Sequence, residues 1–111
     1  MIVLLAEDDS GARETLARLI EAEGHGVQAA PDGTIAWEMF QRFEPDLVLS
    51  DLHMPGMSGI DLLSHIRRLG ENCPVIIMTA HGSEEAAQAA IRHGANDYLR
   101  KPIEPAELQR V

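Results

Sequence analysis

The sequence is short of aromatic residues, cysteine and positive charge, and each shortage excludes something. Aromatic residues make up 4% of the 111 residues, so aliphatic side chains have to build the hydrophobic core. The single cysteine, Cys73, excludes an internal disulfide and a cysteine-rich zinc site, and we expect it to be a small buried thiol. The formal net charge of -9 argues against nucleic-acid binding by this chain, because phosphate contacts need clustered lysine and arginine.

Long apolar runs and metal-binding histidine patterns are also missing. No run reaches the ~20 residues of a membrane span, and the start MIVLLAEDD lacks the basic segment and cleavage site of a secretory signal. The histidines show no HxxxH or similar spacing: His25, His53, His65, His81 and His93. We therefore expect a cytoplasmic protein, with one domain over residues 1–111 and no contact with a membrane.

Alternating strand and helix patterns predict an α/β fold. Apolar runs rich in valine, isoleucine and leucine start near Ile2, Val27, Leu47 and Val75, with a shorter run at 98–99. The runs IVLLA, LVLS and VIIM are continuously apolar, which is typical of parallel strands covered on both faces. The prediction is a doubly wound, five-stranded parallel sheet with helices on both faces, and in such sheets ligands bind at the carboxyl ends of the strands.

Capping residues mark the first two helices. The first is expected over about 11–23 with Gly24 at its end, and its apolar stripe consists of Ala12, Leu16, Leu19 and Ile20. Asp32 is expected to cap the second helix, which stops before Pro45. Its predicted apolar face consists of Ala36, Met39, Phe40 and Phe43.

The later helices are predicted in the same way. Ser58 and Ser83 are expected to cap the third and fourth helices, and Gly94 to end the fourth. The predicted face of the third is Leu62, Leu63, Ile66 and Leu69; that of the fourth is the smaller set Ala86, Ala87, Ala90 and Ile91. A weak apolar face lets a helix shift. A fifth helix begins at Pro105 and is expected to be incomplete within this chain.

Polar residues follow four of the five predicted strands. They are Glu7, Asp8 and Asp9 after the first strand, Asp51 after the third, Thr79 after the fourth and Lys101 after the fifth. Taken singly, each has an ordinary explanation as a helix cap, turn residue, packing residue or solvated lysine. Their joint placement at one edge of the sheet indicates a functional site.

These residues carry a family resemblance. EDD, SDLHMPGMSG, MTA and DYLRKP occur in this order over nearly the whole chain, and the sequence resembles a response-regulator receiver domain of bacterial two-component signalling. The resemblance implies the flavodoxin-like strand order 2-1-3-4-5 and a cis peptide between Lys101 and Pro102. It implies a regulatory phosphoacceptor domain, which catalyses only its own phosphorylation and dephosphorylation, rather than an enzyme.

Electrostatics supports a metal at the acidic residues. Carboxylates 4 Å apart repel by up to about 4 kcal/mol per pair at an effective dielectric of 20, and a hard divalent cation relieves this repulsion. Mg²⁺ (or Mn²⁺) prefers oxygen ligands, so the prediction places it on Asp8 and Asp51 with Glu7 behind them. The resemblance adds the backbone carbonyl of His53 as a ligand. Asp51 is then expected to need no general base, because an unperturbed aspartate is ionised at pH 7.

The resemblance also implies the reaction and the switch. Asp51 would accept a phosphoryl group from a sensor histidine kinase or phosphotransfer protein, with Lys101 and Thr79 neutralising or binding its oxygens. Thr79 would then move, and Tyr98 would turn inward and change the surface of the fourth helix and fifth strand. A half-buried strand aromatic is an equally good interpretation of Tyr98. An output domain is expected beyond Val111, and the resemblance allows a homodimer.

Two other functions compete with this one. A flavodoxin-like flavin carrier needs hydroxyls and glycines after the first strand, where this sequence has AEDDSG. An aspartyl-phosphate phosphatase carries its nucleophile early in the chain with a second acid two residues later, whereas Asp51 is central and followed by Leu52 and His53. A flavin absorbance spectrum, or sustained hydrolysis of a generic phosphate ester, discriminates between these functions.

Overall fold

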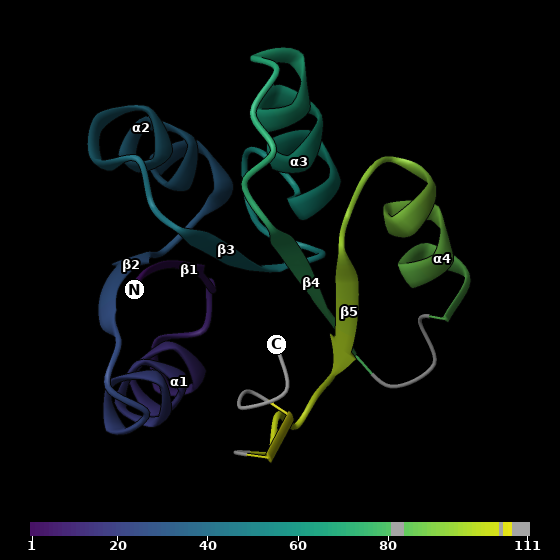
Figure 1. Ribbon diagram of the computed structural model, residues 1–111. Coiled ribbons are helices and arrows are strands. Elements are labelled where there is room, and N and C mark those ends of the chain that lie inside the picture. The colour runs from purple at the N-terminus through teal and green to yellow at the C-terminus, as the bar shows by residue number, and fades with distance from the viewer. Residues whose placement is uncertain (81–83, 105, 108–111) are drawn as a thin grey trace.

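A five-stranded, all-parallel sheet forms the centre of the structure, a computed structural model that describes residues 1–80, 84–104 and 106–107 (Figure 1). The strand order is β2-β1-β3-β4-β5, which confirms the predicted topology. The strands are β1 (Ile2–Ala6), β2 (Gly26–Ala30), β3 (Leu47–Asp51), β4 (Val75–Thr79) and β5 (Asp97–Arg100). The helices are α1 (Ser10–Ala22), α2 (Gly33–Phe43), α3 (Gly59–Arg68) and α4 (Glu84–Arg92). None of these helices is long and apolar enough to cross a membrane.

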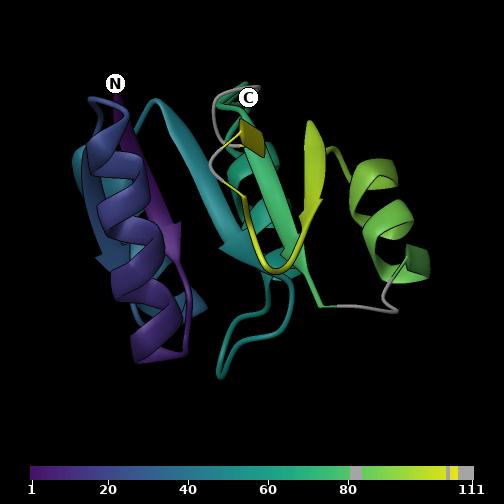
Figure 2. The ribbon, with the colours of Figure 1, turned by 90° about the horizontal axis from the view of Figure 1, so that it is seen from below.

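Helices cover both faces of the sheet, as predicted (Figures 1 and 2). One face packs on α2, α3 and α4, through a core that includes Leu4, Val48, Ile77, Phe40, Leu63 and Ala90. The opposite face packs on α1, through a core that includes Leu5, Leu49, Met78, Leu16 and Ile20. Every strand of the central three is buried on both sides, because its side chains alternate between these two cores.

Side-chain caps begin three of the helices. Asp9 accepts a hydrogen bond from the Ala12 N–H at 2.8 Å, and Asp32 accepts one from the Ile35 N–H at 2.8 Å. Ser58 forms a capping box with Asp61. The predicted caps at positions 32 and 58 are therefore confirmed. The predicted cap at position 83, and most of the predicted fifth helix, lie outside the described residues.

Four apolar residues are less buried than the sequence pattern predicts, among them Ile91 of α4, which is 40% exposed. Phe43 is 47% exposed at the last position of α2, and Leu69 is 55% exposed at the C-cap of α3. Both lie where the helix ends, so the stripe there no longer faces the sheet. Cys73 is only half-buried, and this burial raises the pKa of its thiol.

The guanidinium of Arg67 joins the end of α3 to the connection between α4 and β5. Its Nε and Nη2 donate to the Gly94 carbonyl at 3.1 and 3.0 Å, and Nη2 also donates to Asn96 Oδ1 at 3.0 Å. Nη1 donates to the carbonyls of Glu71 and Cys73 at 3.0 and 2.9 Å. All five N–H donors of the side chain are thus used, which ties the C-terminal end of α4 to α3 and β4.

Candidate functional site

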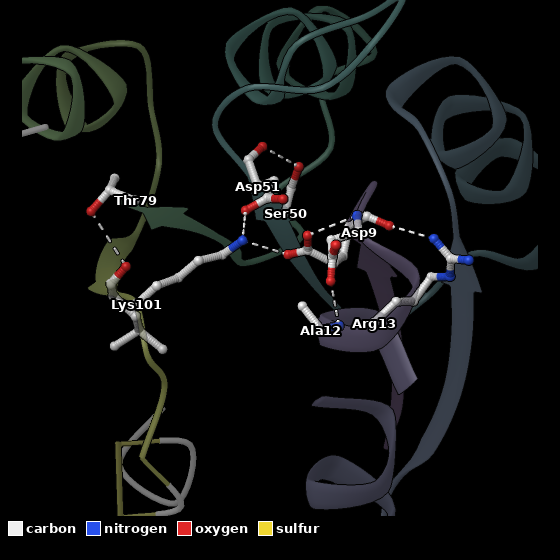
Figure 3. Close-up of polar contacts among 9 residues, drawn as sticks. Asp9, Ala12, Arg13, Ser50, Asp51, Thr79 and Lys101 are labelled. Atoms are coloured by element: carbon white, nitrogen blue, oxygen red, sulfur yellow. Dashed lines mark hydrogen bonds and ion pairs between the residues drawn. The ribbon is translucent and has the colours of Figure 1, made fainter. Parts of the chain in front are cut away.

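The carboxyl ends of β1, β3, β4 and β5 meet at one edge of the sheet and bring the predicted site residues together (Figure 3). Glu7 follows β1, Asp51 ends β3, Thr79 ends β4 and Lys101 follows β5. Parallel strands place these ends side by side although the residues are far apart in the sequence. The Lys101–Pro102 peptide is cis, as the resemblance implied.

Lys101 bridges two buried carboxylates. Its Nζ lies 2.6 Å from Glu7 Oε2 and 2.5 Å from Asp51 Oδ1 (Figure 3). The Glu7 and Asp51 side chains are 1% and 8% exposed, whereas that of Lys101 is 30% exposed. One cation therefore compensates two carboxylates that have almost no access to water, which stabilises charges that burial alone would strongly disfavour.

Contacts from α1 hold Glu7 in place. Its Oε1 accepts a hydrogen bond from the Asp9 N–H at 3.1 Å, so both of its carboxylate oxygens have partners. Arg13 Nη1 donates to the Glu7 carbonyl at 2.8 Å (Figure 3). Arg13 was not among the predicted site residues, because a backbone carbonyl acceptor leaves no signal in the sequence.

Glu7, Asp8 and Asp51 form an acidic cluster that could hold a metal ion. Each offers one carboxylate oxygen, and these three atoms lie within 4.8 Å of one another. Asp8 is exposed, whereas the other two acids are buried, so the cluster opens to solvent on one side. Oxygen ligands at this spacing suit Mg²⁺, which keeps several waters and uses one or two carboxylates. His53 lies two residues after Asp51 and is exposed; its carbonyl as a further ligand stays a prediction.

Burial changes the protonation of the central acid. It raises the pKa of Asp51 from 3.8 to about 7; the neighbouring Glu7 adds to the rise and Lys101 opposes it. The two carboxylates in turn raise the pKa of Lys101, although its own burial works in the opposite direction. In the metal-free site Asp51 is therefore not an unperturbed aspartate, and the ionised form expected with metal bound stays a prediction. Further positive charge near Asp51 would lower its pKa and favour the ionised carboxylate.

Thr79 and Tyr98 lie on the β4–β5 side of the site. The Thr79 side chain is buried, and its hydroxyl donates to the Leu99 carbonyl at 3.5 Å (Figure 3). Tyr98 is half-buried and packs against the core under α2, α3 and α4. This position agrees with the interpretation of Tyr98 as a half-buried strand aromatic. Its role as a switch stays a prediction.

Close backbone packing fixes the carbonyl of Asp51. Ser50 Oγ donates to this carbonyl at 2.9 Å, and the Leu52 N–H donates to the Met78 carbonyl at 3.0 Å. A Cβ at Gly59 would lie 2.2 Å from the Asp51 carbonyl oxygen. Gly59 is therefore needed for the close approach of α3 to β3 and not for its backbone conformation, because its φ is not positive.

The structure is a doubly wound α/β domain with an acidic site at the carboxyl ends of its strands, and comparison with known proteins identifies the family. The family model described as response regulator receiver domain matches residues 3–111. The chain therefore belongs to the response regulator receiver family. This membership favours the receiver interpretation over the flavin carrier and the phosphatase.

Related sequences support this assignment. The chain is 42% identical over its whole length to an uncharacterized 14.6 kDa protein of Leptolyngbya boryana and covers 86% of it. It is 36% identical to the response regulator MprA of Mycobacterium leprae, over 97% of this chain and 47% of MprA. It is 42% identical to the response regulator protein FleR of Pseudomonas aeruginosa, over 96% of this chain and 22% of FleR. The chain thus spans half or less of the two response regulators.

Solved structures show the same architecture. A response regulator receiver domain protein from Clostridium thermocellum superposes with a TM-score of 0.93 at 32% identity, covering 98% of this chain and 88% of that one. NtrX from Brucella abortus in complex with ADP gives a TM-score of 0.92 at 31% identity, covering 98% of this chain and 25% of NtrX. The fold is therefore that of receiver domains.

Proposed function

We propose that this chain is a phosphorylation-dependent signalling switch in which Asp51 accepts a phosphoryl group. The observation that carries the proposal is the pair of ion pairs from Lys101 to Glu7 and Asp51. Beside them lies the exposed Asp8, so the site is accessible from solvent. Receiver-family membership supports it. The donor would be the phosphohistidine of a sensor histidine kinase or phosphotransfer protein.

In the proposed reaction a carboxylate oxygen of Asp51 attacks phosphorus, and the bond from phosphorus to the histidine nitrogen breaks. The phosphoryl group brings added negative charge into a site that is already anionic, so catalysis consists of positioning and charge neutralisation. Mg²⁺ or Mn²⁺ bound by Asp8 and Asp51, with Glu7 behind and the His53 carbonyl, would supply two positive charges. Lys101 then neutralises a phosphoryl oxygen, and the Thr79 hydroxyl turns from Leu99 to donate to another.

A groove beside the site suits docking of the donor protein. It has a volume of about 470 Å³ and lies between α1 and residues 101–103, with Ala12, Leu16 and Leu19 on one side and Ile103 on the other. Lys101 forms part of its wall. A partner seated on this apolar surface would present its phosphohistidine to Asp51.

We further propose that phosphorylation changes the α4–β5 surface through Thr79 and Tyr98. The fully buried part of α4 described by the structure is the small side chain of Ala90, and Ile91 is 40% exposed. A helix held by small side chains loses little buried area when it shifts, and the shift would involve the N-terminal part of α4, because Arg67 ties its C-terminal end to α3. The changed surface would control an output domain beyond Val111, a homodimer contact or another partner, in a cytoplasmic pathway of transcription regulation. With its net charge of -9, the domain itself is not expected to bind nucleic acid.

Phosphorylation by a small phosphodonor tests this proposal. Acetyl phosphate with Mg²⁺ should add one phosphate to the wild type and none to Asp51→Asn, as measured by intact-protein mass spectrometry. Asp9→Asn is the matched control, because asparagine also caps a helix and Asp9 touches the site only through its backbone N–H. Phosphate on Asp51→Asn, or a wild type that stays unmodified with and without Mg²⁺, would contradict the proposal.

A further inference from the structure

The loop that follows Asp51 packs closely against Gly33, the first residue of α2. This loop, residues 52–58, leads from β3 to α3 and contains His53; we call it the phosphoacceptor loop. A Cβ at Gly33 would lie 1.8 Å from the Met57 carbonyl oxygen and 2.6 Å from its carbonyl carbon. The φ of Gly33 is not positive, so this position needs glycine for space and not for its backbone conformation.

The same two segments lie close together at a second point. Gly56 has a φ of +75°, and a Cβ there would lie 2.8 Å from Thr34 Oγ1. At its far end the loop is held by the Gly59 N–H, which donates to the Leu52 carbonyl at 2.9 Å. The loop is thus fixed at its two ends by β4 and α3 and in its middle by α2.

We propose that Gly33 is a positioning residue for the phosphoacceptor site, acting through the loop. This inference rests on the proposed function. α2 packs onto the sheet through the buried Ala36 and Phe40, so the helix has little room to retreat. A Cβ atom at Gly33 would lie 1.8 Å from the Met57 carbonyl oxygen, whereas real Cβ contacts are essentially never shorter than 3.0 Å. A side chain at Gly33 therefore moves the Met57 backbone by more than ~1 Å. The displacement is passed along the loop toward His53 and Asp51.

The expected effect is a weaker metal site in a folded protein. Changes to groups that orient metal ligands cost about 10- to 100-fold in metal affinity or activity. We expect Gly33→Ala to lower Mg²⁺ affinity, and to slow phosphorylation of Asp51, by factors in this range. Gly70→Ala is the control: Gly70 has a φ of +78°, and a Cβ there would meet no atom within 4 Å, so the change destabilises the fold without touching the loop.

Titration calorimetry with Mg²⁺ and hydrogen exchange in the metal-free protein form the test. Gly33→Ala should bind Mg²⁺ more weakly, and the N–H groups of Leu52 and Gly59 should exchange faster than its global stability accounts for. Gly70→Ala should keep the wild-type Mg²⁺ affinity, and the same two N–H groups should exchange faster only by the amount that its lost global stability predicts. Wild-type affinity and exchange in folded Gly33→Ala would overturn the inference. If the wild type itself takes up no Mg²⁺, the proposed function fails, but the two exchange rates still decide whether Gly33 positions the loop.

A double-mutant cycle covers the case in which Gly33→Ala does not fold. Gly56→Ala should weaken Mg²⁺ binding several-fold more when Thr34 is intact than in the background of Thr34→Ala, because that change removes the 2.8 Å contact and leaves the nearest atom at 3.9 Å. Thr34 is exposed, so its truncation alone should be nearly neutral. Equal effects of Gly56→Ala in both backgrounds would overturn the coupling of the loop to α2.

Discussion

Replacing the phosphoacceptor by a neutral isostere should make the stability of the metal-free protein less sensitive to pH. Burial raises the pKa of Asp51 from 3.8 to about 7. A carboxyl with a raised pKa binds more protons in the folded state, so the free energy of unfolding falls as the pH rises from about 4 to about 7. The Asp51→Asn variant has no titrating group at this position and should escape this loss.

The size of the effect follows from the two pKa values. For each pH unit between the two pKa values, the free energy of unfolding falls by about 1.4 kcal/mol. Since pH 5 lies about one unit above the unfolded value, the loss between pH 5 and pH 8 is about 2–3 kcal/mol for the wild type. Asp51→Asn should therefore gain about 2–3 kcal/mol relative to the wild type over this interval.

Urea unfolding of both proteins at pH 5 and pH 8, with a chelator present, measures this double difference. Adding Mg²⁺ at pH 8 should restore much of the lost stability to the wild type and less to Asp51→Asn, because a metal that binds only the folded state stabilises it. A difference between the two proteins that stays constant from pH 5 to pH 8 would refute the argument, because Asp51 would then titrate alike in the folded and unfolded chain.

Three further outcomes are expected. Lys101→Ala should retain Mg²⁺ binding but raise the pKa of Asp51 above about 7, since the lysine lowers it; a carboxyl ¹³C NMR titration checks this, and an unchanged titration would contradict it. Arg67→Gln should lower the free energy of unfolding by about 2–4 kcal/mol through lost hydrogen bonds, whereas the exposed Arg68→Gln should change it little; equal urea midpoints would show that the Arg67 contacts contribute nothing. Ser58→Ala should cost about 1 kcal/mol by removing the capping box, and Ser64→Ala, within the same helix, serves as its comparison.

Features set by local pattern were predictable from the sequence. The strands follow from continuous apolar runs, and Asp32 and Ser58 could be assigned as caps because capping depends on residues a few positions apart. The grouping of Glu7, Asp51 and Lys101 was predictable because parallel strands bring their carboxyl ends to one edge.

Features set by burial and by contacts between distant backbone segments were not predictable. The raised pKa of Asp51 depends on how much water the surrounding loops exclude, which no motif encodes. The need for glycine at Gly33 comes from the Met57 carbonyl of a different loop. Arg67 binds mostly backbone carbonyls, and every residue has one, so the sequence pattern carries no trace of its partners.

The ion pair between Lys101 and Glu7 joins residues that are 94 positions apart in the chain. The site is therefore complete only after nearly the whole chain has been made and folded. During synthesis the two acids leave the ribosome long before the lysine does, and their ion pairs with Lys101 cannot form until β5 has paired with β4. A nascent or partly unfolded chain therefore carries separate, hydrated acids and no assembled site. Under the proposed function, a kinase could phosphorylate only molecules that have finished folding. The ion pair would thus restrict signalling to correctly folded protein.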